Sequence, residues 1–148
     1  MNNLSFDQRF HLGVYGILIN NGRILLIKKS RGPYKGMYDL PGGGIEFGEK
    51  VEEALRRELM EEVGIGLGGS KFVGYNEHFS EYDNEQGEPR RMHHVGLYFL
   101  ISAEFESIKK DSDGHDSLGA EFVEIKDLDS FKIAPIAEPM IRAATNKL

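Results

Sequence analysis

The chain has 148 residues, of which 40% are hydrophobic and 28% charged, and this predicts a single folded domain over residues 1–148 rather than a disordered chain. A formal net charge of −6 without a long Lys/Arg stripe argues against a nucleic-acid-binding surface, and no apolar run approaches the roughly 20 residues that cross a bilayer. The absence of cysteine excludes disulfides and thiolate metal sites, and together with an N-terminus unlike a signal peptide it predicts a cytoplasmic protein.

The first predicted elements are two strands at His11–Asn20 and Arg23–Ser30, both rich in aliphatic and β-branched residues. The segment Asn20-Asn21-Gly22 between them is typical of a tight hairpin, because its central positions tolerate positive φ. Both apolar runs are nearly continuous, without the alternation of a sheet that has one face in water. They therefore predict strands that are covered on both faces.

A loop follows at Arg31–Gly36, and short strands are expected at Met37–Leu40 and Ile45–Phe47. From Glu49 onward the apolar residues recur every four positions, which predicts an amphipathic helix. Its apolar stripe consists of Val51, Leu55, Leu59 and Val63. Gly64 is the expected end of this helix, because glycine readily adopts the left-handed conformation that closes helices.

The second half of the chain alternates strands and loops before a last helix. Strands are expected at Lys71–Phe79 and Met92–Phe105, joined by the polar segment Asp83–Pro89, and a further strand is expected at Glu121–Ile125. Ala134–Lys147 has helical composition. Strands interleaved with two helices predict an α/β (α+β) fold, with a mixed β-sheet and a helix on each face.

The first helix carries a dense set of glutamates that a solvated surface explains only in part. Glu52 and Glu53 fit such a surface, since arginines lie one turn further along. Glu58, Glu61 and Glu62 do not, because spacings of three and four residues bring Glu58 against both others, and like charges so placed repel. A divalent cation would relieve the repulsion, and Mg²⁺ prefers such oxygen ligands together with phosphate oxygens. From spacing alone, a solvated face and a metal site both stay open.

A glycine run precedes this helix, at Pro41-Gly42-Gly43-Gly44. Consecutive glycines permit close approach of a ligand to the backbone, with a simple tight turn as the alternative. Run and helix together form one continuous pattern: Gly43, five residues, Glu49, seven residues, and then Arg57 to Ile65. The segment Gly43–Ile65 resembles the Nudix box in every fixed position and in both bulky-aliphatic positions. The chain therefore resembles the Nudix hydrolase superfamily, and its order of elements is similar to that family's α/β/α sandwich.

The resemblance implies an Mg²⁺-dependent hydrolase, with Mn²⁺ as an alternative metal, that cleaves a diphosphate linkage in a nucleoside diphosphate joined to another group X. The implied metal ligands are Glu58, Glu61, Glu62 and the backbone carbonyl of Gly42, with Glu49 at the edge of the metal shell. Arg57 is implied to orient the glutamates, where a surface ion pair is the simpler alternative. Bound cations would stabilise the charge that develops as water attacks phosphorus.

The general base is left open between two places in the chain. A carboxylate beside the metal can take the proton, and some members of the superfamily use a glutamate of the box, here Glu58 or Glu61. Others use an acidic residue in a late loop, where this chain offers Asp116; an ordinary turn residue is the alternative there. Glu121 is expected to be a strand residue instead.

Several residues outside the helix are candidates for substrate contacts. Lys28 and Lys29 occupy a strand end where similar proteins contact phosphates, although a solvated strand end explains them equally well. Gly43 and Gly44 would let a substrate approach the backbone. Tyr82 lies seventeen residues past the box, where dinucleoside polyphosphate hydrolases often have a tyrosine.

Two further pairs are ambiguous in the same way. Arg90 and Arg91 fit either phosphate binding or a solvated surface. His93 and His94 are adjacent on a predicted strand, so their side chains point to opposite faces. This argues against a metal-binding pair and allows one of the two to line a pocket.

The choice among substrates rests on Tyr82 and on subtype signatures that the chain lacks. The ADP-ribose subtype usually has a proline about fifteen residues past the box, and here no proline lies between Pro41 and Pro89. The favoured function is a MutT-like nucleoside or deoxynucleoside triphosphate pyrophosphohydrolase. The alternatives are a dinucleoside polyphosphate or nucleotide-sugar hydrolase and a non-catalytic nucleotide-binding regulatory module. The expected partner is a small nucleotide rather than a nucleic acid or a membrane, and the resemblance is compatible with a homodimer.

Overall fold

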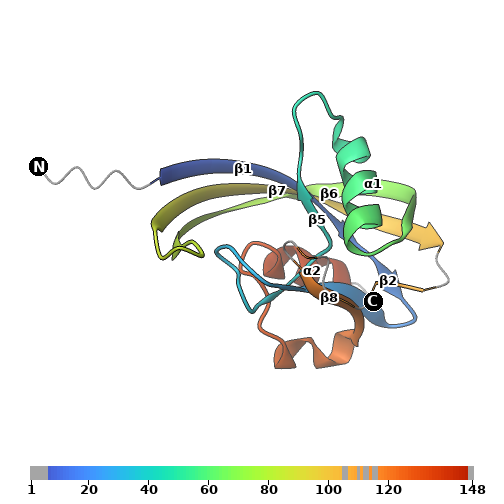
Figure 1. Ribbon diagram of the computed structural model, residues 1–148. Helices are drawn as coiled ribbons and strands as arrows, with labels where there is room; N and C mark the ends of the chain where they lie inside the picture. Colours follow the sequence, from blue (N-terminus) through green and yellow to red (C-terminus); the bar gives the residue numbers. More distant parts are fainter. Residues whose placement is uncertain (1–6, 105–106, 110, 112–113, 115–116, 147–148) are drawn as a thin grey trace, which may run out of the picture.

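The computed structural model describes residues 7–104, 107–109, 111, 114 and 117–146, and it contains two four-stranded sheets (Figure 1). The first sheet has the strand order β5-β1-β7-β6, with β1 and β7 parallel and the outer pairs antiparallel. Its strands are β1 (Asp7–Ile17), β5 (Gly42–Gly44), β6 (Gly66–Asp83) and β7 (Pro89–Glu104). This is the expected mixed sheet, and β5 lies at its edge.

The second sheet is built around β3, which pairs antiparallel with β2, β4 and β8. Its strands are β2 (Ile19–Asn20), β3 (Arg23–Lys29), β4 (Tyr38–Asp39) and β8 (Ser117–Glu124). The described part of the chain also contains three helical segments: α1 (Val51–Glu62), the 3₁₀-helix η1 (Ile125–Ser130) and α2 (Glu138–Thr145). Among the described ranges no helix is long and apolar enough to cross a membrane.

The strands separate two hydrophobic cores, one under each helix. Successive side chains of β1 and β3 point to opposite faces. Val14 and Leu25 therefore pack with α1, whereas Tyr15 and Ile24 pack in the core that contains residues of α2. All four side chains are buried. The prediction that these strands are covered on both faces is therefore confirmed.

The local signals around the first helix are also confirmed. Asn21 and Gly22 both have positive φ, 52° and 74°, at the hairpin between β2 and β3. The helix α1 follows Lys50, and Gly64 after its end has a φ of 77°. Its apolar stripe is buried against the strands while its glutamates lie toward β5 or solvent, as the four-residue period predicts.

Two element predictions were wrong. Ile45–Phe47 is not a strand, because the backbone of Gly42–Gly44 forms β5 by pairing with β1, and the following residues form the loop that projects before α1 (Figure 1). The last helix begins at Glu138 rather than Ala134. Pro139 is in its first turn, where no amide donor is needed.

Candidate active site

Strand β5 lies between two groups of candidate functional side chains, the carboxylates of α1 on one side and side chains of β1 on the other. Its residues are all glycine, and a Cβ added at Gly43 would lie 2.6 Å from the Glu58 carboxylate carbon, whereas one at Gly44 would lie 3.0 Å from the His11 ring. Gly42 has a φ of 145° and lies against Tyr15. Only glycine lets carboxylates approach the strand from one side and the side chains of β1 from the other.

Two carboxylates of α1 lie directly against this strand. Glu62 is 4% exposed, and its Oε1 accepts a hydrogen bond of 3.1 Å from the Gly42 amide. Glu58 lies over Gly43 with its side chain 18% exposed. The spacing of four residues places both on one face of α1, as expected. The buried Glu62 shows that this face is not merely a solvated surface.

Arg57 is the cation that holds Glu49, Glu58 and Glu61. Its guanidinium donates to both carboxylate oxygens of Glu49, at 2.7 and 2.9 Å, to Glu58 at 2.8 Å and to Glu61 at 3.3 Å. It also donates to the Gly44 carbonyl at 2.9 Å. Hydrogen bonds from Arg57 and from the Glu46 amide lower the pKa of Glu49 to about 2, and the pKa of Arg57 is raised by its bond to Glu49. Arg57 therefore fastens the loop after β5 to α1.

The donor set of this region suits a hard divalent cation. It offers only carboxylate and carbonyl oxygens, which are the ligands Mg²⁺ prefers. Over the described residues, no three His, Asp or Glu side chains already converge as metal ligands. Arg57 donates hydrogen bonds to Glu58 and Glu61. An ion held by these two carboxylates would replace Arg57 there and leave the Glu49–Arg57 pair in place. These residues therefore fit a divalent cation, and Glu58 and Glu61 would then bind the ion in place of Arg57.

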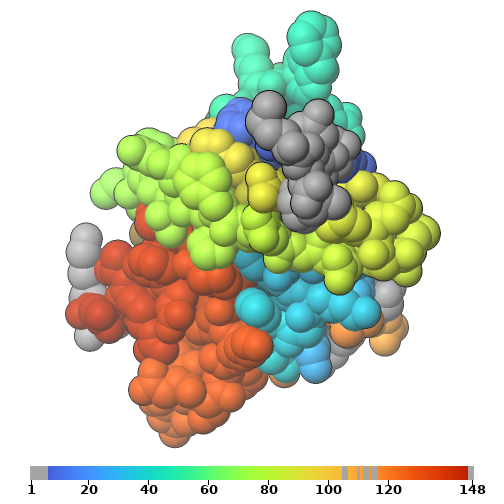
Figure 2. All heavy atoms as spheres, turned by 90° about the vertical axis from the view of Figure 1, so that its left-hand side faces the viewer, coloured from blue at the N-terminus to red at the C-terminus, as the bar shows by residue number. Residues whose placement is uncertain are grey.

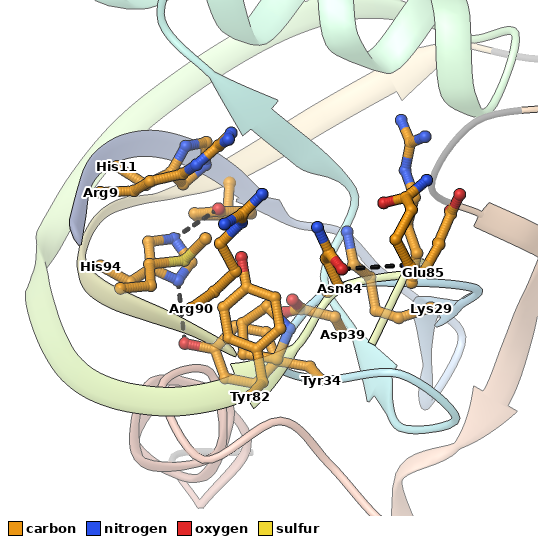
Figure 3. Close-up of a pocket in the computed structure, with 16 residues that line it drawn as sticks. Arg9, His11, Lys29, Tyr34, Asp39, Tyr82, Asn84, Glu85, Arg90 and His94 are labelled. Atoms are coloured by element: carbon orange, nitrogen blue, oxygen red, sulfur yellow. Dashed lines mark hydrogen bonds between the residues drawn. The ribbon is translucent and has the colours of Figure 1, made fainter. Parts of the chain in front are cut away.

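A cavity of about 570 Å³ lies on the other side of β5 (Figure 3). Figure 2 shows the β6–β7 hairpin (yellow-green) against the segment between β3 and β4 (cyan), and residues of both line the cavity. Four cationic side chains, Arg9, Lys29, Arg31 and Arg90, are among the lining residues. The carboxylates of Asp39 and Glu85 also line the cavity, so four cations face two carboxylates. An excess of positive charge in a protein of net charge −6 favours an anionic ligand.

The cavity floor is polar and buried. His94 is 2% exposed, and its ring nitrogens are 2.7 Å from the Tyr15 hydroxyl and 2.9 Å from the Tyr34 hydroxyl. Burial, followed by the charges of His11 and Lys29, lowers the pKa of His94 to about 3. Burial raises the pKa of the neighbouring Asp39 to about 6, against the opposing effect of Lys29. His94 is thus a neutral hydrogen-bonding group at physiological pH.

The residues expected to contact substrate divide into two groups. Lys29 and Tyr82 line the cavity, and Gly44 lies against His11, which also lines it. Lys28 is exposed and not among the lining residues; its Nζ is 5.9 Å from the Tyr38 ring. Alternation along β3 explains why two adjacent lysines differ in this way.

In each of the pairs His93/His94 and Arg90/Arg91 on β7, one residue lines the cavity and the other does not. His94 lines the cavity, whereas His93 is 2.8 Å from Glu77. Arg90 lines the cavity, whereas Arg91 is exposed and 3.0 Å from Glu81.

The late-loop candidates were Glu121 and Asp116. Glu121 is exposed on β8, as expected for a strand residue. Asp116 lies outside the described residues.

Sequence reasoning missed the cavity floor, formed by Tyr15, Tyr34 and Asp39. These residues come from β1, from the loop before β4 and from β4 itself, so no spacing pattern connects them. One local signal was present: Asp39 is a carboxylate between apolar residues directly before the glycine run. A charged side chain in such surroundings is rarely buried without a function.

Comparison with known proteins identifies the family. The NUDIX domain model matches residues 9–144, so the chain belongs to the NUDIX family. One relative is an ADP-ribose pyrophosphatase of Methanocaldococcus jannaschii, 34% identical over 117 residues, which cover 79% of this chain and 63% of that protein. Another is the nucleoside triphosphatase NudI of Escherichia coli, 50% identical over 53 residues, which cover 34% of this chain and 38% of NudI. The chain thus spans less than two thirds of the length of these relatives.

Solved structures share the fold. A MutT NUDIX hydrolase from Burkholderia pseudomallei is 28% identical with a TM-score of 0.66, and the match covers 95% of this chain and 98% of that one. The NUDIX domain of Shewanella oneidensis NrtR, solved with ADP ribose, is 16% identical with a TM-score of 0.71 and covers 94% of this chain and 88% of that one. The second likeness concerns the fold alone.

Proposed function

We propose that this protein is a Mg²⁺-dependent hydrolase that cleaves a diphosphate linkage in a nucleoside diphosphate derivative. The observation that carries the proposal is the arrangement around β5, with buried and half-buried carboxylates of α1 on one side and a cation-lined cavity on the other. A substrate whose phosphates extend from the cavity over the glycine edge would reach both. The hydrolase names of the relatives support the same reaction class.

In the proposed site, Glu58 and Glu62 would hold the metal, with Glu61 and the Gly42 carbonyl as further ligands and Mn²⁺ as an alternative ion. When bound, the ion supplies positive charge that stabilises the entering and leaving oxygens. Arg57 keeps Glu49 and the β5 carbonyl fixed, so that the carboxylates are oriented before the substrate arrives.

The chemistry is a displacement at phosphorus. A water oxygen forms a bond to one phosphorus of the diphosphate, the bond from that phosphorus to the bridging oxygen breaks, and two phosphate products leave. The proton of the water passes to a general base. Glu61 is the base candidate within the described part of the chain, because its side chain is 63% exposed and is held to Arg57 only at 3.3 Å.

For the substrate, a nucleoside or deoxynucleoside triphosphate is the first choice and ADP-ribose the second. The nucleoside triphosphatase name of NudI supports the first, and the pyrophosphatase of Methanocaldococcus jannaschii supports the second. Dinucleoside polyphosphates, suggested by the place of Tyr82 in the cavity, are the third substrate class to be tested.

The proposed location of the protein is the cytoplasm. Sedimentation velocity would test the expectation of a homodimer.

The test is hydrolysis of this panel by the wild-type protein and by Glu62→Gln. With Mg²⁺ present we expect turnover of at least one substrate, abolished by EDTA, and a kcat lowered by about 10²–10³-fold in Glu62→Gln, because one carboxylate charge at the reaction centre is lost. Glu52→Gln is the matched control, since Glu52 is exposed on the same helix and is 3.6 Å from Arg56. Full activity of Glu62→Gln would refute the assignment of the site.

A further inference from the structure

His11 lies where the cavity meets the glycine strand. It lines the cavity, and a Cβ built on Gly44 would lie 3.0 Å from its Cε1. A Cβ built on the preceding residue, Gly43, would lie 2.6 Å from the Glu58 carboxylate carbon. Adjacent residues of a strand are about 3.3 Å apart along its axis. His11 and the proposed metal ligand Glu58 therefore approach β5 at successive positions, from opposite faces.

Strand pairing explains why the ring of His11 can lie against β5. Gly44 pairs with Gly13 of β1, and side chains alternate along β1, so His11 shares the face of Gly13. Neither glycine has a side chain that would separate the two strands from the ring. The Ile45 amide donates to the Leu12 carbonyl at 3.0 Å, which holds the end of β5 beside His11.

The ring edge that contains both nitrogens of His11 faces Gly44. A Cβ built on Gly44 would lie 3.0 Å from Cε1, 3.7 Å from Nδ1 and 3.9 Å from Nε2. A neutral imidazole has one N–H donor and a protonated imidazole has two. An N–H donor therefore lies at this edge whichever nitrogen has the proton.

The wall of the cavity around His11 is cationic. Arg9 is on the same face of β1, two residues before His11 (Figure 3), and Arg90 of β7 also lines the cavity. Asp7 lies 3.2 Å from Arg9 and 3.4 Å from Arg90, and Glu88 lies 3.5 Å from Arg90. Neither carboxylate is among the residues that line the cavity. This wall therefore favours an anionic group of the ligand.

Other lining residues suit a nucleoside. The cavity of about 570 Å³ has a size typical of small-molecule sites. Tyr15, Tyr34 and Tyr82 are among its lining residues, and aromatic rings are the groups on which nucleobases stack. A nucleoside in the cavity would thus have its phosphate at the cationic wall.

We propose that His11 is a substrate-binding residue, which donates a hydrogen bond to the phosphate of the nucleoside that the cavity holds. The next phosphate then lies over Gly43, where Glu58 and the ion are, and the leaving group is on the α1 side of β5. This inference rests on the proposed function and adds the orientation of the substrate. Packing on His94, at a ring centroid distance of 4.9 Å, is the simpler role for His11, and the experiment separates the two.

The test is the affinity for dGMP and AMP, measured by calorimetry in EDTA for wild type, His11→Phe and His11→Gln. Phenylalanine keeps a ring beside His94 but has no donor, whereas glutamine keeps an N–H donor. The Kd should rise by about tenfold or more in His11→Phe, as loss of a hydrogen bond to a charged group predicts. It should rise less in His11→Gln. Deoxyguanosine, which has no phosphate, should bind wild type and both variants equally.

His93→Phe is the matched control, because it makes the same replacement on the other face of the sheet. The side chain of His93 is 2.8 Å from Glu77 and is not among the residues that line the cavity. Its Kd values should equal those of wild type. Thermal unfolding checks that each variant is folded. His11→Leu, which also lacks a donor, replaces His11→Phe if that variant does not fold.

Equal Kd values for dGMP and AMP in wild type and in the variant without a donor overturn the proposal. So do an equal loss in His93→Phe, a loss for deoxyguanosine as large as that for dGMP, or a wild-type protein that binds neither nucleotide. In these cases EDTA-sensitive hydrolysis that is lost in Glu62→Gln would leave the proposed function intact. If nucleotide binding depends on His11 but no substrate is hydrolysed, the proposed function fails and the phosphate contact is supported.

Discussion

At the scale of single residues, Arg57 and Glu62 near β5 make different kinds of hydrogen bond. Arg57 binds Glu49 with two hydrogen bonds, which removes one negative charge from competition for a metal. Glu62 accepts a hydrogen bond from the Gly42 amide. A carboxylate at this place is an oxygen ligand of the kind that a divalent cation prefers.

Asp39 gives a prediction about stability and pH. Burial raises its pKa to about 6 in the folded protein, against about 3.9 in an unfolded chain. Between these values the folded state binds more protons, so this contribution to stability is fully present below about pH 4 and is lost as the pH rises through 6. The unfolding free energy of Asp39→Asn, relative to that of the wild type, should rise between pH 4.5 and pH 7.5 by on the order of 1–3 kcal/mol.

Urea unfolding at pH 4.5, 5.5, 6.5 and 7.5 measures this difference. His94 has the opposite linkage, because its lowered pKa favours the folded state at higher pH, but it is present in both proteins and cancels. A difference that is constant over this range would contradict the burial of Asp39 as a charged group.

At the scale of elements, the glycine strand is the feature on which the two halves of the site depend. Gly43→Ala would place a Cβ 2.6 Å from the Glu58 carboxylate carbon, so the side chain of Glu58 must move. The strand itself should tolerate alanine, since its φ at this position is not positive. We expect Mg²⁺ affinity to fall by about tenfold or more, as for disturbed outer contacts of a metal ligand, with little loss of stability.

Gly66→Ala is the control for that change, because nothing lies within 4 Å of a Cβ at this start of β6. Calorimetric titration with Mg²⁺ and Mn²⁺ gives the affinities, and thermal unfolding gives the stabilities. If Gly43→Ala binds the ions as tightly as Gly66→Ala, Glu58 is not a ligand.

The sequence could predict α1 and its carboxylates, since a period of four and spacings of three and four are local properties of one helix. It could not predict β5, because three glycines have no strand propensity and become a strand only through pairing with Gly13–Tyr15. The cavity floor was missed for a related reason. Tyr15 and His94 are 79 residues apart, and only the tertiary fold brings them to 2.7 Å.

At the scale of the whole molecule, the sheet arrangement explains why one site can use both cores. The helix α1 packs on one face of β1 and β3, and the cavity residue Tyr15 belongs to the core on the other face. At β5, an edge strand of its sheet, Gly43 faces Glu58 and Gly44 faces His11, so groups from the two faces come close to one strand. A ligand bound across this edge would connect α1, β5 and β1, and should therefore stabilise the folded state as a unit.

Metal binding should be visible in global stability for this reason. An ion at 100 times its Kd adds about 2.7 kcal/mol, which raises the Tm of a domain of this size by roughly 5–10 °C. We expect this increase for the wild type and for Glu52→Gln in saturating Mg²⁺ or Mn²⁺, reversed by EDTA, and a much smaller one for Glu58→Gln. Scanning calorimetry measures all three. A full increase in Glu58→Gln would mean that the ion binds elsewhere. Glu52→Gln is the control, because it removes the same charge from the exposed face of the same helix.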